Sequence, residues 1–222
     1  MPLRFKFFIS QFIRLLFPQE CLGCGKLDTF ICSACLGAIP IREAGREKVR
    51  HQDFLDRVLI VSFYSHPLIP PLLEHYKYRG RQQLSAPLAQ LFITFIKRNK
   101  LAKTLSGFYL LPLPLHRRRY LERGFNQSEL LAREISWQFS WPLITDNLWR
   151  RFYTRHQTEL KAVQRQQNIK GAFAVRNAKY LVGRKILLID DVITTGASLN
   201  EAARVLKQAG ARQVWALVLA KN

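Results

Sequence analysis

Acidic residues are scarce in this sequence of 222 residues. Asp and Glu number 15 against 35 Lys and Arg, which gives a formal net charge of +20 at pH 7. Intrinsic disorder is excluded, because 48% of the residues are hydrophobic and 12% aromatic, enough apolar surface to offset the entropy of ordering the chain. The composition predicts a folded, strongly basic protein with polyanionic partners: nucleic acid, phosphorylated small molecules or an acidic membrane surface.

Long apolar runs are also missing. A bilayer-spanning helix needs about 20 apolar residues, whereas the best stretch, residues 7–17, is interrupted by Gln11 and Arg14. No small-residue cleavage site follows before Pro18, so a secretory signal is not favoured either. Apolar residues recur at helical spacing over residues 5–16, which predicts an amphipathic helix docked on its own domain, with a membrane surface as the alternative. We expect a cytoplasmic protein without stable membrane insertion.

Cysteine is absent outside one segment of fifteen residues, where two Cys-x-x-Cys pairs stand seven residues apart: Cys21, Cys24, Cys32 and Cys35. Four thiolates at this spacing can surround one tetrahedral ion, and in a reducing cytosol the pattern favours zinc over disulfides. A redox dithiol and a nucleic-acid-reading finger are the alternatives. We favour a structural zinc ion, because four thiolate ligands leave no open coordination position for catalysis.

Two common catalytic patterns have no counterpart in the sequence. There is no Gly-x-x-x-x-Gly-Lys phosphate loop and no Ser/His/Asp arrangement, and the five histidines lack metal-binding spacing. Among the histidines only His116, which precedes three arginines, is a candidate for a functional role.

The strongest chemical pattern lies near the C-terminal end. Residues 185–189 form a short apolar run typical of a buried parallel strand, which two aspartates end. Residues 192–198 are typical of a turn, residues 199–209 have helical spacing, and residues 213–219 suit a second strand. The pattern predicts a βαβ unit, whose strand-to-helix turn lies where open α/β sheets bind ligands.

That turn has the chemistry of a phosphate-monoester site. Successive N–H groups and the start of the following helix attract an anion, and the glycine permits close approach of the backbone. The predicted phosphate-binding residues are Thr194, Thr195, Gly196, Ala197 and Ser198. Asp190 and Asp191 would repel a phosphate. As paired carboxylates they suit the 2′ and 3′ hydroxyls of a ribose instead, directly or through a Mg²⁺ shell.

Residues 186–198 resemble the phosphoribosyl pyrophosphate (PRPP) motif of type I phosphoribosyltransferases. Together with residues 110–127, which lead into an expected helix over residues 128–139, and with the four cysteines, they make the chain similar to the ComF family from residue 17 to residue 214. The resemblance implies an α/β fold, a type I phosphoribosyltransferase-like parallel sheet flanked by helices with an N-terminal four-cysteine zinc knuckle, and binding of PRPP with Mg²⁺.

The expected architecture has two parts. Residues 1–50 hold the amphipathic helix and the zinc knuckle, and residues 51–222 form the phosphoribosyltransferase-like domain. By order along the chain, the polar and basic residues 152–170 occupy the slot of the mobile flap that covers the active site in type I phosphoribosyltransferases.

Basic residues are candidates for the pyrophosphate end of such a ligand. Arg117, Arg119 and Arg123 follow a short strand and are expected on a loop that contacts the pyrophosphate, with a solvated basic face as the alternative. Lys77 belongs to a Lys-Tyr-x-Gly segment that resembles one in the ComF family. We expect it to be a solvated turn lysine in preference to a ligand contact.

Two functions compete. In the favoured one, which the resemblance implies, a PRPP-binding protein serves DNA uptake in natural transformation and binds single-stranded DNA in the cytoplasm. Its implied protein partners are a helicase-like competence protein and a recombination mediator. In the alternative, the protein is a phosphoribosyltransferase in which Asp190 and Asp191 orient the ribose while the phosphoribosyl group passes, with inversion, to an unknown acceptor.

Charge favours the DNA-related function, because +20 far exceeds what one PRPP molecule needs. Residues 148–170 hold six Lys and Arg against one Glu, with Trp149, Phe152 and Tyr153 among them. Basic and aromatic residues interleaved in this way can follow phosphates and stack on bases. Packing of Trp149 and Phe152 into the core fits the sequence equally well.

Overall fold

The computed structural model describes residues 19–45, 49–152 and 169–222. The chain divides into two compact units, Met1–Pro40 and Ile41–Asn222, and the domain division expected after residue 50 stays a prediction. The amphipathic helix expected over residues 5–16 lies outside the described residues. Among the helices that are described, none is both long and apolar enough to cross a membrane.

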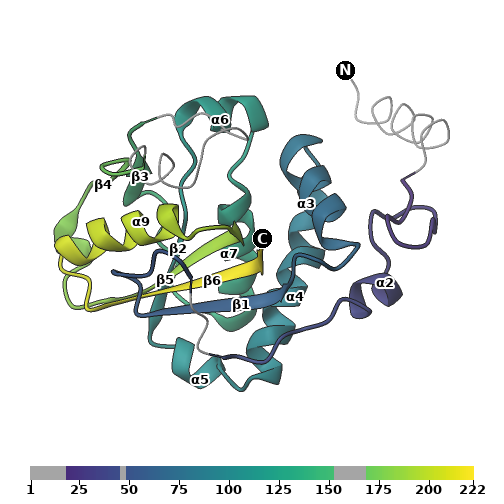
Figure 1. The fold of residues 1–222 in the computed structure, drawn as a ribbon, viewed down its shortest axis with the longest axis horizontal. Helices are drawn as coiled ribbons and strands as arrows, with labels where there is room; N and C mark the ends of the chain where they lie inside the picture. The colour runs from purple at the N-terminus through teal and green to yellow at the C-terminus, as the bar shows by residue number, and fades with distance from the viewer. Residues whose placement is uncertain (1–18, 46–48, 153–168) are drawn as a thin grey trace, which may run out of the picture. The chain divides into compact units, whose positions relative to one another are not determined.

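The described part of the smaller unit consists of tight turns followed by a short helix, α2 (Ser33–Gly37) (Figure 1). An antiparallel bridge joins Glu20 to Leu27, around a turn in which Gly25 has a φ of +73°. Cys32 caps α2, because its Sγ accepts a hydrogen bond from the backbone N–H of Cys35 at 3.4 Å. Each Cys-x-x-Cys pair therefore lies at a turn or a helix start, where short segments can converge.

The larger unit is built on a parallel sheet of four strands in the order β1-β6-β5-β2 (Figure 1). The strands are β1 (Arg57–Phe63), β6 (Gln213–Lys221), β5 (Lys185–Ile193) and β2 (Phe108–Pro112). Apolar residues fill the first half of β5 and most of β6 and are buried. Such continuous apolar runs are typical of strands with both faces covered. The predicted α/β fold with a parallel sheet is confirmed.

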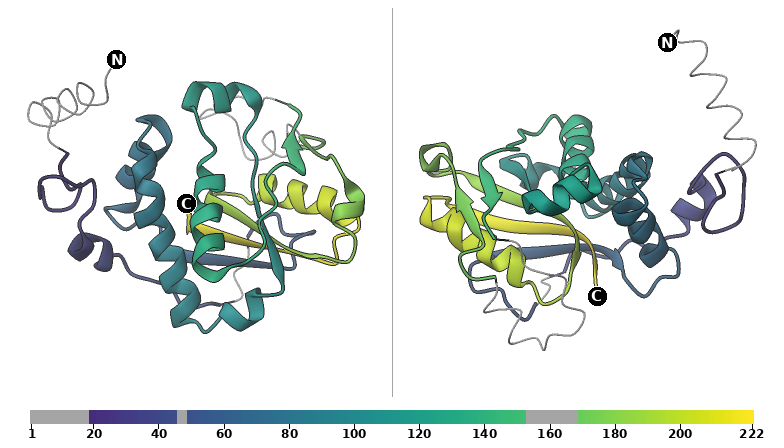
Figure 2. Two further views of the ribbon diagram at one scale, coloured as in Figure 1. Left: turned by 180° about the vertical axis from the view of Figure 1, so that it is seen from behind. Right: turned by 90° about the horizontal axis from the view of Figure 1, so that it is seen from above.

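Helices cover both faces of this sheet, as Figure 2 shows. On one face α9 (Ala197–Gln208) buries Leu199 and Leu206 in a core with Ile186 and Leu188 of β5. On the other face lie α4 (Ser85–Arg98) and α7 (Gln127–Phe139), which contact each other and the strands. Because successive side chains of a strand point to opposite faces, each strand contributes to both layers.

The remaining elements connect these layers. They are α3 (Ile69–Tyr78), α5 (Ala102–Leu105), α6 (Arg117–Arg123), 3-10 turns at Gln82–Leu84 and Ala178–Tyr180, and an antiparallel pair, β3 (Leu148–Arg150) and β4 (Phe173–Val175). The backbone N–H of Arg151 donates to the carbonyl of Ala172 at 2.7 Å, next to this pair. Most of the segment expected to form the flap, residues 153–168, lies outside the described residues.

The helices expected over residues 128–139 and 199–209 are confirmed as α7 and α9, but two local predictions are wrong. Asp190 and Asp191 do not end their strand, because β5 continues to Ile193 and keeps its register with β6. The extension gives the backbone groups around the aspartates partners in the sheet. The acid pair therefore lies on a rigid strand.

The second wrong prediction is the arginine loop, because Arg117, Arg119 and Arg123 lie on the helix α6. Nδ1 of His116 accepts a hydrogen bond from the N–H of Arg118 at 3.2 Å and so caps the helix start. Gly124, with a φ of +82°, ends it. His116 thus has a structural role here, and the helix fixes the spacing of the arginine side chains.

Candidate functional site

Two adjacent carboxylates on β5 form the centre of the candidate site. Asp191 is only 3% exposed, and its Oδ1 lies 2.8 Å from Nζ of Lys77 on α3. Oδ1 of Asp190 accepts a hydrogen bond from Oγ of Ser128 at 2.9 Å. Ser128 is fully buried in the first turn of α7. The pair is therefore held by one cation and one hydroxyl that come from different helices.

Burial and neighbouring charges govern the ionisation of Asp190. Burial and the neighbouring charge of Asp191 raise the pKa of Asp190 to about 7, although Lys77 and Ser128 oppose the shift. Burial alone would lower the pKa of Lys77, but Asp191 and Asp190 raise it above its ordinary value. The ammonium therefore stays charged, and Asp190 is a group that titrates close to neutral pH.

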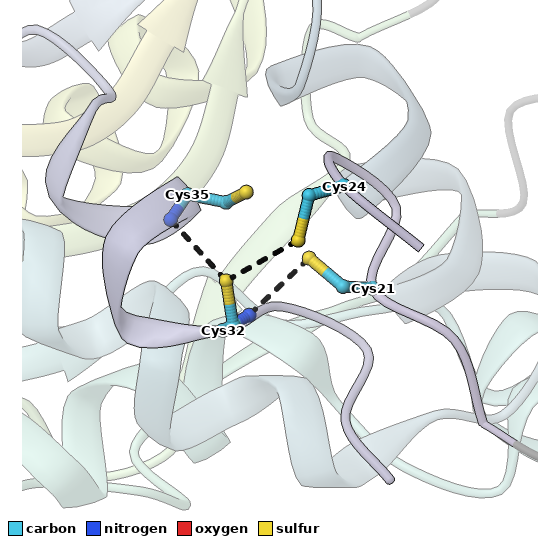
Figure 3. Close-up of side chains that lie close together, drawn as sticks. All are labelled: Cys21, Cys24, Cys32 and Cys35. Carbon is cyan, nitrogen blue, oxygen red and sulfur yellow. Dashed lines mark hydrogen bonds between the residues drawn. The ribbon is translucent and has the colours of Figure 1, made fainter. Parts of the chain in front are cut away.

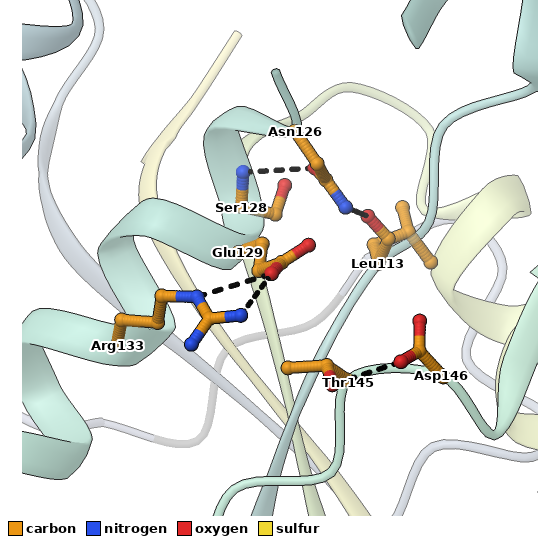
Figure 4. Close-up of polar contacts among 7 residues, drawn as sticks. All are labelled: Leu113, Asn126, Ser128, Glu129, Arg133, Thr145 and Asp146. Carbon is orange, nitrogen blue, oxygen red and sulfur yellow. Dashed lines mark hydrogen bonds and ion pairs between the residues drawn. The ribbon is translucent and has the colours of Figure 1, made fainter.

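The start of α7 is fixed to Leu113, the residue that follows β2 (Figure 4). Oδ1 of Asn126 accepts a hydrogen bond from the N–H of Ser128 at 3.1 Å, and its Nδ2 donates to the carbonyl of Leu113 at 3.2 Å. The N–H of Leu113 donates in turn to the carbonyl of Ile189 on β5 at 2.9 Å. The helix start is thereby tied to the strand at the residue that precedes Asp190.

The last turn of α3 is fixed to the same helix start. Tyr76 is fully buried, and its hydroxyl donates to the carbonyl of Gln127 at 2.8 Å. Burial raises the pKa of Tyr76 well above its ordinary value, so the hydroxyl keeps its proton and remains a donor. Oε1 of Gln127 accepts a hydrogen bond from Nη1 of Arg123. One residue of α7 thus connects α3 to α6, next to Lys77.

A cavity of about 390 Å³ lies beside Lys77. The end of α3 and one side of α6 line it: Lys77, Tyr78, Arg79, Gly80, Arg119, Glu122 and Arg123. Four cations against one carboxylate give the cavity a positive potential that suits a multiply charged anion. Of the predicted pyrophosphate contacts, Arg119 and Arg123 line the cavity, whereas Arg117 is exposed and is not among the lining residues.

The predicted phosphate-binding residues are divided between two elements: Thr194, Thr195 and Gly196 form the turn after β5, whereas Ala197 and Ser198 already belong to α9, so the turn is shorter than the predicted 192–198. Gly196 has a φ of +86°, and a Cβ there would lie 2.8 Å from the carbonyl oxygen of His51, so a larger residue does not fit. The N–H of His51 donates to the carbonyl of Thr195 at 3.1 Å. Because α9 begins at this turn, its first N–H groups are not used by the helix itself and can bind an anion.

In the smaller unit the four cysteine side chains converge (Figure 3). The Sγ atoms of Cys21, Cys24, Cys32 and Cys35 all lie within 4.8 Å of one another, and those of Cys24 and Cys32 are 3.7 Å apart. In a tetrahedral zinc site with Zn–S bonds of about 2.3 Å, the sulfur atoms stand about 3.8 Å apart. The cluster could therefore hold one metal ion such as zinc.

The ionisation of these thiols favours a bound cation. Burial raises the pKa of Cys21, but hydrogen bonds from the N–H groups of Cys32, Cys24 and Gly23 outweigh burial and lower it to about 6. The pKa of Cys35 is raised to about 12, mainly by hydrogen bonding with Cys32 and Cys24. A bound divalent cation would lower the pKa of Cys35 again, because it stabilises all four thiolates at once.

The amino-acid sequence is similar to those of known proteins. The family described as phosphoribosyl transferase domain matches residues 126–222, which include the acid pair. Competence protein F of Haemophilus influenzae is 32% identical over 169 residues, 74% of this chain and 73% of that protein. The chain belongs to the ComF family. Within the family, competence protein ComFC of Bacillus subtilis is 31% identical over 193 residues, 86% of this chain and 72% of that protein. DNA utilization protein YhgH of Escherichia coli K12 is 32% identical over 167 residues, 72% of this chain and 71% of that protein.

The contacts of two site residues in this ComF-family protein could not be predicted from the sequence. The expectation that Lys77 is solvated is wrong, because its side chain is 19% exposed and is paired with Asp191. Ser128 lies at an unremarkable helix start, and only the fold brings it to Asp190. The sequence signals for Lys77 are its place in the Lys-Tyr-x-Gly segment and its position directly after Tyr76, which belongs to the apolar side of α3.

The aromatic residues next to the expected flap are exposed in this ComF-family protein. Trp149 and Phe152 are 40% and 54% exposed, so they do not pack into the core. The guanidinium of Arg151 lies 6.0 Å from the ring centre of Trp149 and 5.6 Å from that of Phe152. Tyr153, the third aromatic residue of the predicted stretch, lies outside the described residues.

We predict that Asp190→Asn stabilises the free protein at alkaline pH. A carboxyl whose pKa is raised on folding is protonated more readily in the folded state, so its ionisation destabilises the fold increasingly as pH rises from about 4 to about 7. The amide of the Asn variant does not ionise in this pH range, so the variant does not lose stability in this way. In urea unfolding, the advantage of the variant should grow by roughly 1–2 kcal/mol between pH 5 and pH 8. The exposed Asp146→Asn is the control, and a constant difference across this pH range would contradict the prediction.

We predict that the purified protein contains about one zinc ion per chain, held by the four thiolates. Cys24→Ser should lose most of the metal, because a serine hydroxyl is a much poorer zinc ligand than a thiolate. Ser33→Ala, a change inside the second cysteine pair that leaves all four thiols in place, should keep it. Elemental analysis of protein prepared without chelators measures all three. A metal-free wild type, or zinc retained in full by Cys24→Ser, would overturn the assignment.

Proposed function

We propose that this ComF-family protein binds PRPP with Mg²⁺ and acts on single-stranded DNA during natural transformation. The observation that carries the PRPP part is the acid pair: Asp190 and Asp191 lie in the last third of the parallel strand β5, shortly before residues 194–198, and Lys77, which pairs with Asp191, is one of the cations that line the cavity. In open α/β sheets this edge of the sheet is where ligands bind.

Each end of PRPP has a matching group of residues. The carboxylates of Asp190 and Asp191 accept hydrogen bonds from the ribose hydroxyls, and residues 194–198 bind the 5′-phosphate through backbone N–H groups and hydroxyls. Arg117, Arg119 and Arg123 attract the pyrophosphate, with the latter two in the cavity. When Mg²⁺ is bound, it neutralises part of the pyrophosphate charge.

Charge and exposed aromatic rings support the DNA part. Binding of PRPP needs only a few cationic side chains, whereas the chain carries a net charge of +20. Arg151, Trp149 and Phe152 form an exposed basic and aromatic surface beside β3. The names of the relatives, competence protein F and DNA utilization protein, support a role in handling incoming DNA. We place this activity in the cytoplasm, with a helicase-like competence protein and a recombination mediator as partners.

Transfer of the phosphoribosyl group is the alternative function. The cation-lined cavity favours it, because a place for a departing pyrophosphate lies directly against the residues that would hold the ribose. In that reaction a nucleophile forms a bond to the anomeric carbon while the bond to pyrophosphate breaks, with inversion at the carbon. An acceptor that is consumed together with PRPP in the presence of the protein would be the nucleophile of this reaction.

We predict that binding of PRPP depends on the acid pair. In calorimetry with PRPP and Mg²⁺, the double variant Asp190→Asn, Asp191→Asn should bind at least about tenfold more weakly than the wild type, because each lost charged hydrogen bond is worth about 1.5–3 kcal/mol. Asp146→Asn, an exposed carboxylate, is the matched control. Undiminished affinity in a folded double variant would refute the ribose role.

We predict that single-stranded DNA binds through both charge and stacking. Affinity for an oligothymidylate, measured by fluorescence anisotropy, should fall at least about tenfold between 50 and 200 mM salt, because binding releases counterions from the phosphates. Trp149→Ala with Phe152→Ala should weaken binding by at least about tenfold at constant salt. Trp137→Ala, which removes a ring 82% exposed on α7, should have no effect. A flat salt response would exclude this mode of binding.

A further inference from the structure

The ion pair between Lys77 and Asp191 gives the acid pair a cation that the chain itself supplies. Nζ of Lys77 lies 2.8 Å from Oδ1 of Asp191, and the two side chains are 19% and 4% exposed. The second oxygen of Asp191, Oδ2, is buried and accepts no hydrogen bond from the described residues. Lys77 is therefore a cation in direct contact with Asp191, and the charge of Arg123 also acts on this carboxylate.

The position of this ammonium is built into the fold. Lys77 follows the fully buried Tyr76, whose hydroxyl donates to the carbonyl of Gln127. The next residue of α7, Ser128, holds Asp190. The same helix start thus fixes the cation on α3 and one carboxylate on β5. A solvated lysine would be free of such constraints and could leave the carboxylate at little cost.

A buried carboxylate beside a second carboxylate requires a positive charge, which a divalent metal ion often supplies in proteins. Here the ammonium already lies at hydrogen-bonding distance from Asp191. It also lines the cavity with Arg119 and Arg123, so further positive charge lies on that side. A metal ion at Asp191 would have to displace Lys77 and then face these cations.

We propose that Lys77 is a resident cation that takes the place of a divalent metal ion at Asp191. It is a positioning residue, because it acts on the ligand through the carboxylate. The carboxylates then bind a ribose without metal, and Mg²⁺ matters only for ligands that carry a pyrophosphate. This inference rests on the proposed binding of PRPP. It adds that the sugar and the pyrophosphate differ in their need for metal.

The first test uses the protein without any ligand. Thermal unfolding of the wild type and of Lys77→Gln is measured in 5 mM MgCl₂ and in EDTA. The wild type should show no difference between the two buffers, whereas the variant, with its acid pair uncompensated, should melt about 3 °C or more higher in MgCl₂. Lys207→Gln is the matched control, because Lys207 forms a pair of 2.7 Å with Asp56 on the exposed surface. Equal stabilisation of the wild type and Lys77→Gln by Mg²⁺ would overturn the proposal.

The second test needs only the wild type and therefore does not depend on the folding of a variant. Calorimetry compares ribose 5-phosphate with PRPP, each in MgCl₂ and in EDTA. We expect the affinity for ribose 5-phosphate to agree within about twofold in the two buffers, and that for PRPP to fall at least about tenfold in EDTA. A tenfold loss for ribose 5-phosphate in EDTA would refute the role of Lys77 while leaving PRPP binding intact.

The two tests also separate the proposals. If neither ligand binds in either buffer, the proposed binding of PRPP fails, and the inference about sugar binding fails with it. The melting experiment then still decides whether Lys77 excludes Mg²⁺ from the acid pair. If both ligands bind and the wild type is stabilised by Mg²⁺ alone, PRPP binding stands and the resident cation is refuted.

Discussion

Two carboxylates placed side by side in a mostly buried position are the constraint on which the candidate site depends. Asp190 and Asp191 follow each other on a strand that stays paired with its neighbour, so the backbone cannot separate them. Burial and the neighbouring charge of Asp191 both raise the pKa of Asp190. An ammonium from α3 contacts Asp191, and a hydroxyl from α7 donates a hydrogen bond to Asp190. The packing of α3 and α7 against the sheet is therefore needed for the site as well as for the core, because these helices position Lys77 and Ser128.

The cysteine cluster of the smaller unit also brings several negative charges together when its thiols ionise, but it is suited to a different kind of cation. Four thiols within 4.8 Å cannot all ionise without a cation, as the raised pKa of Cys35 indicates. The four sulfur donors suit a soft metal ion. One unit of the chain thus compensates its anionic cluster with a side chain, whereas the other is arranged for an ion taken from solution.

Much of this arrangement could be predicted from the sequence, because the signals are local. The apolar run before Asp190, the glycine of the turn and the helical spacing after it predict a strand, a turn and a helix, and the fold contains all three. The paired cysteines likewise indicate one cluster. The contacts of Lys77 and Ser128 were not predictable in this way, because they join segments that are distant in the chain. The helix α6 was missed because consecutive arginines carry no apolar periodicity, so the helix shows no amphipathic pattern.

The order of the strands has a consequence for how the protein is made. The inner strands of the sheet, β5 and β6, come last in the chain, and the outer strands, β1 and β2, come first. Among the strands of this sheet, β1 pairs with β6 and β2 pairs with β5, while β2 also has one bridge, from Leu110 to Leu143. During synthesis the first two strands therefore leave the ribosome before their partner strands and wait until β5 and β6 emerge. The sheet can close only after β6 has been made, and until then the apolar edges of β1 and β2 must be kept from pairing with other chains.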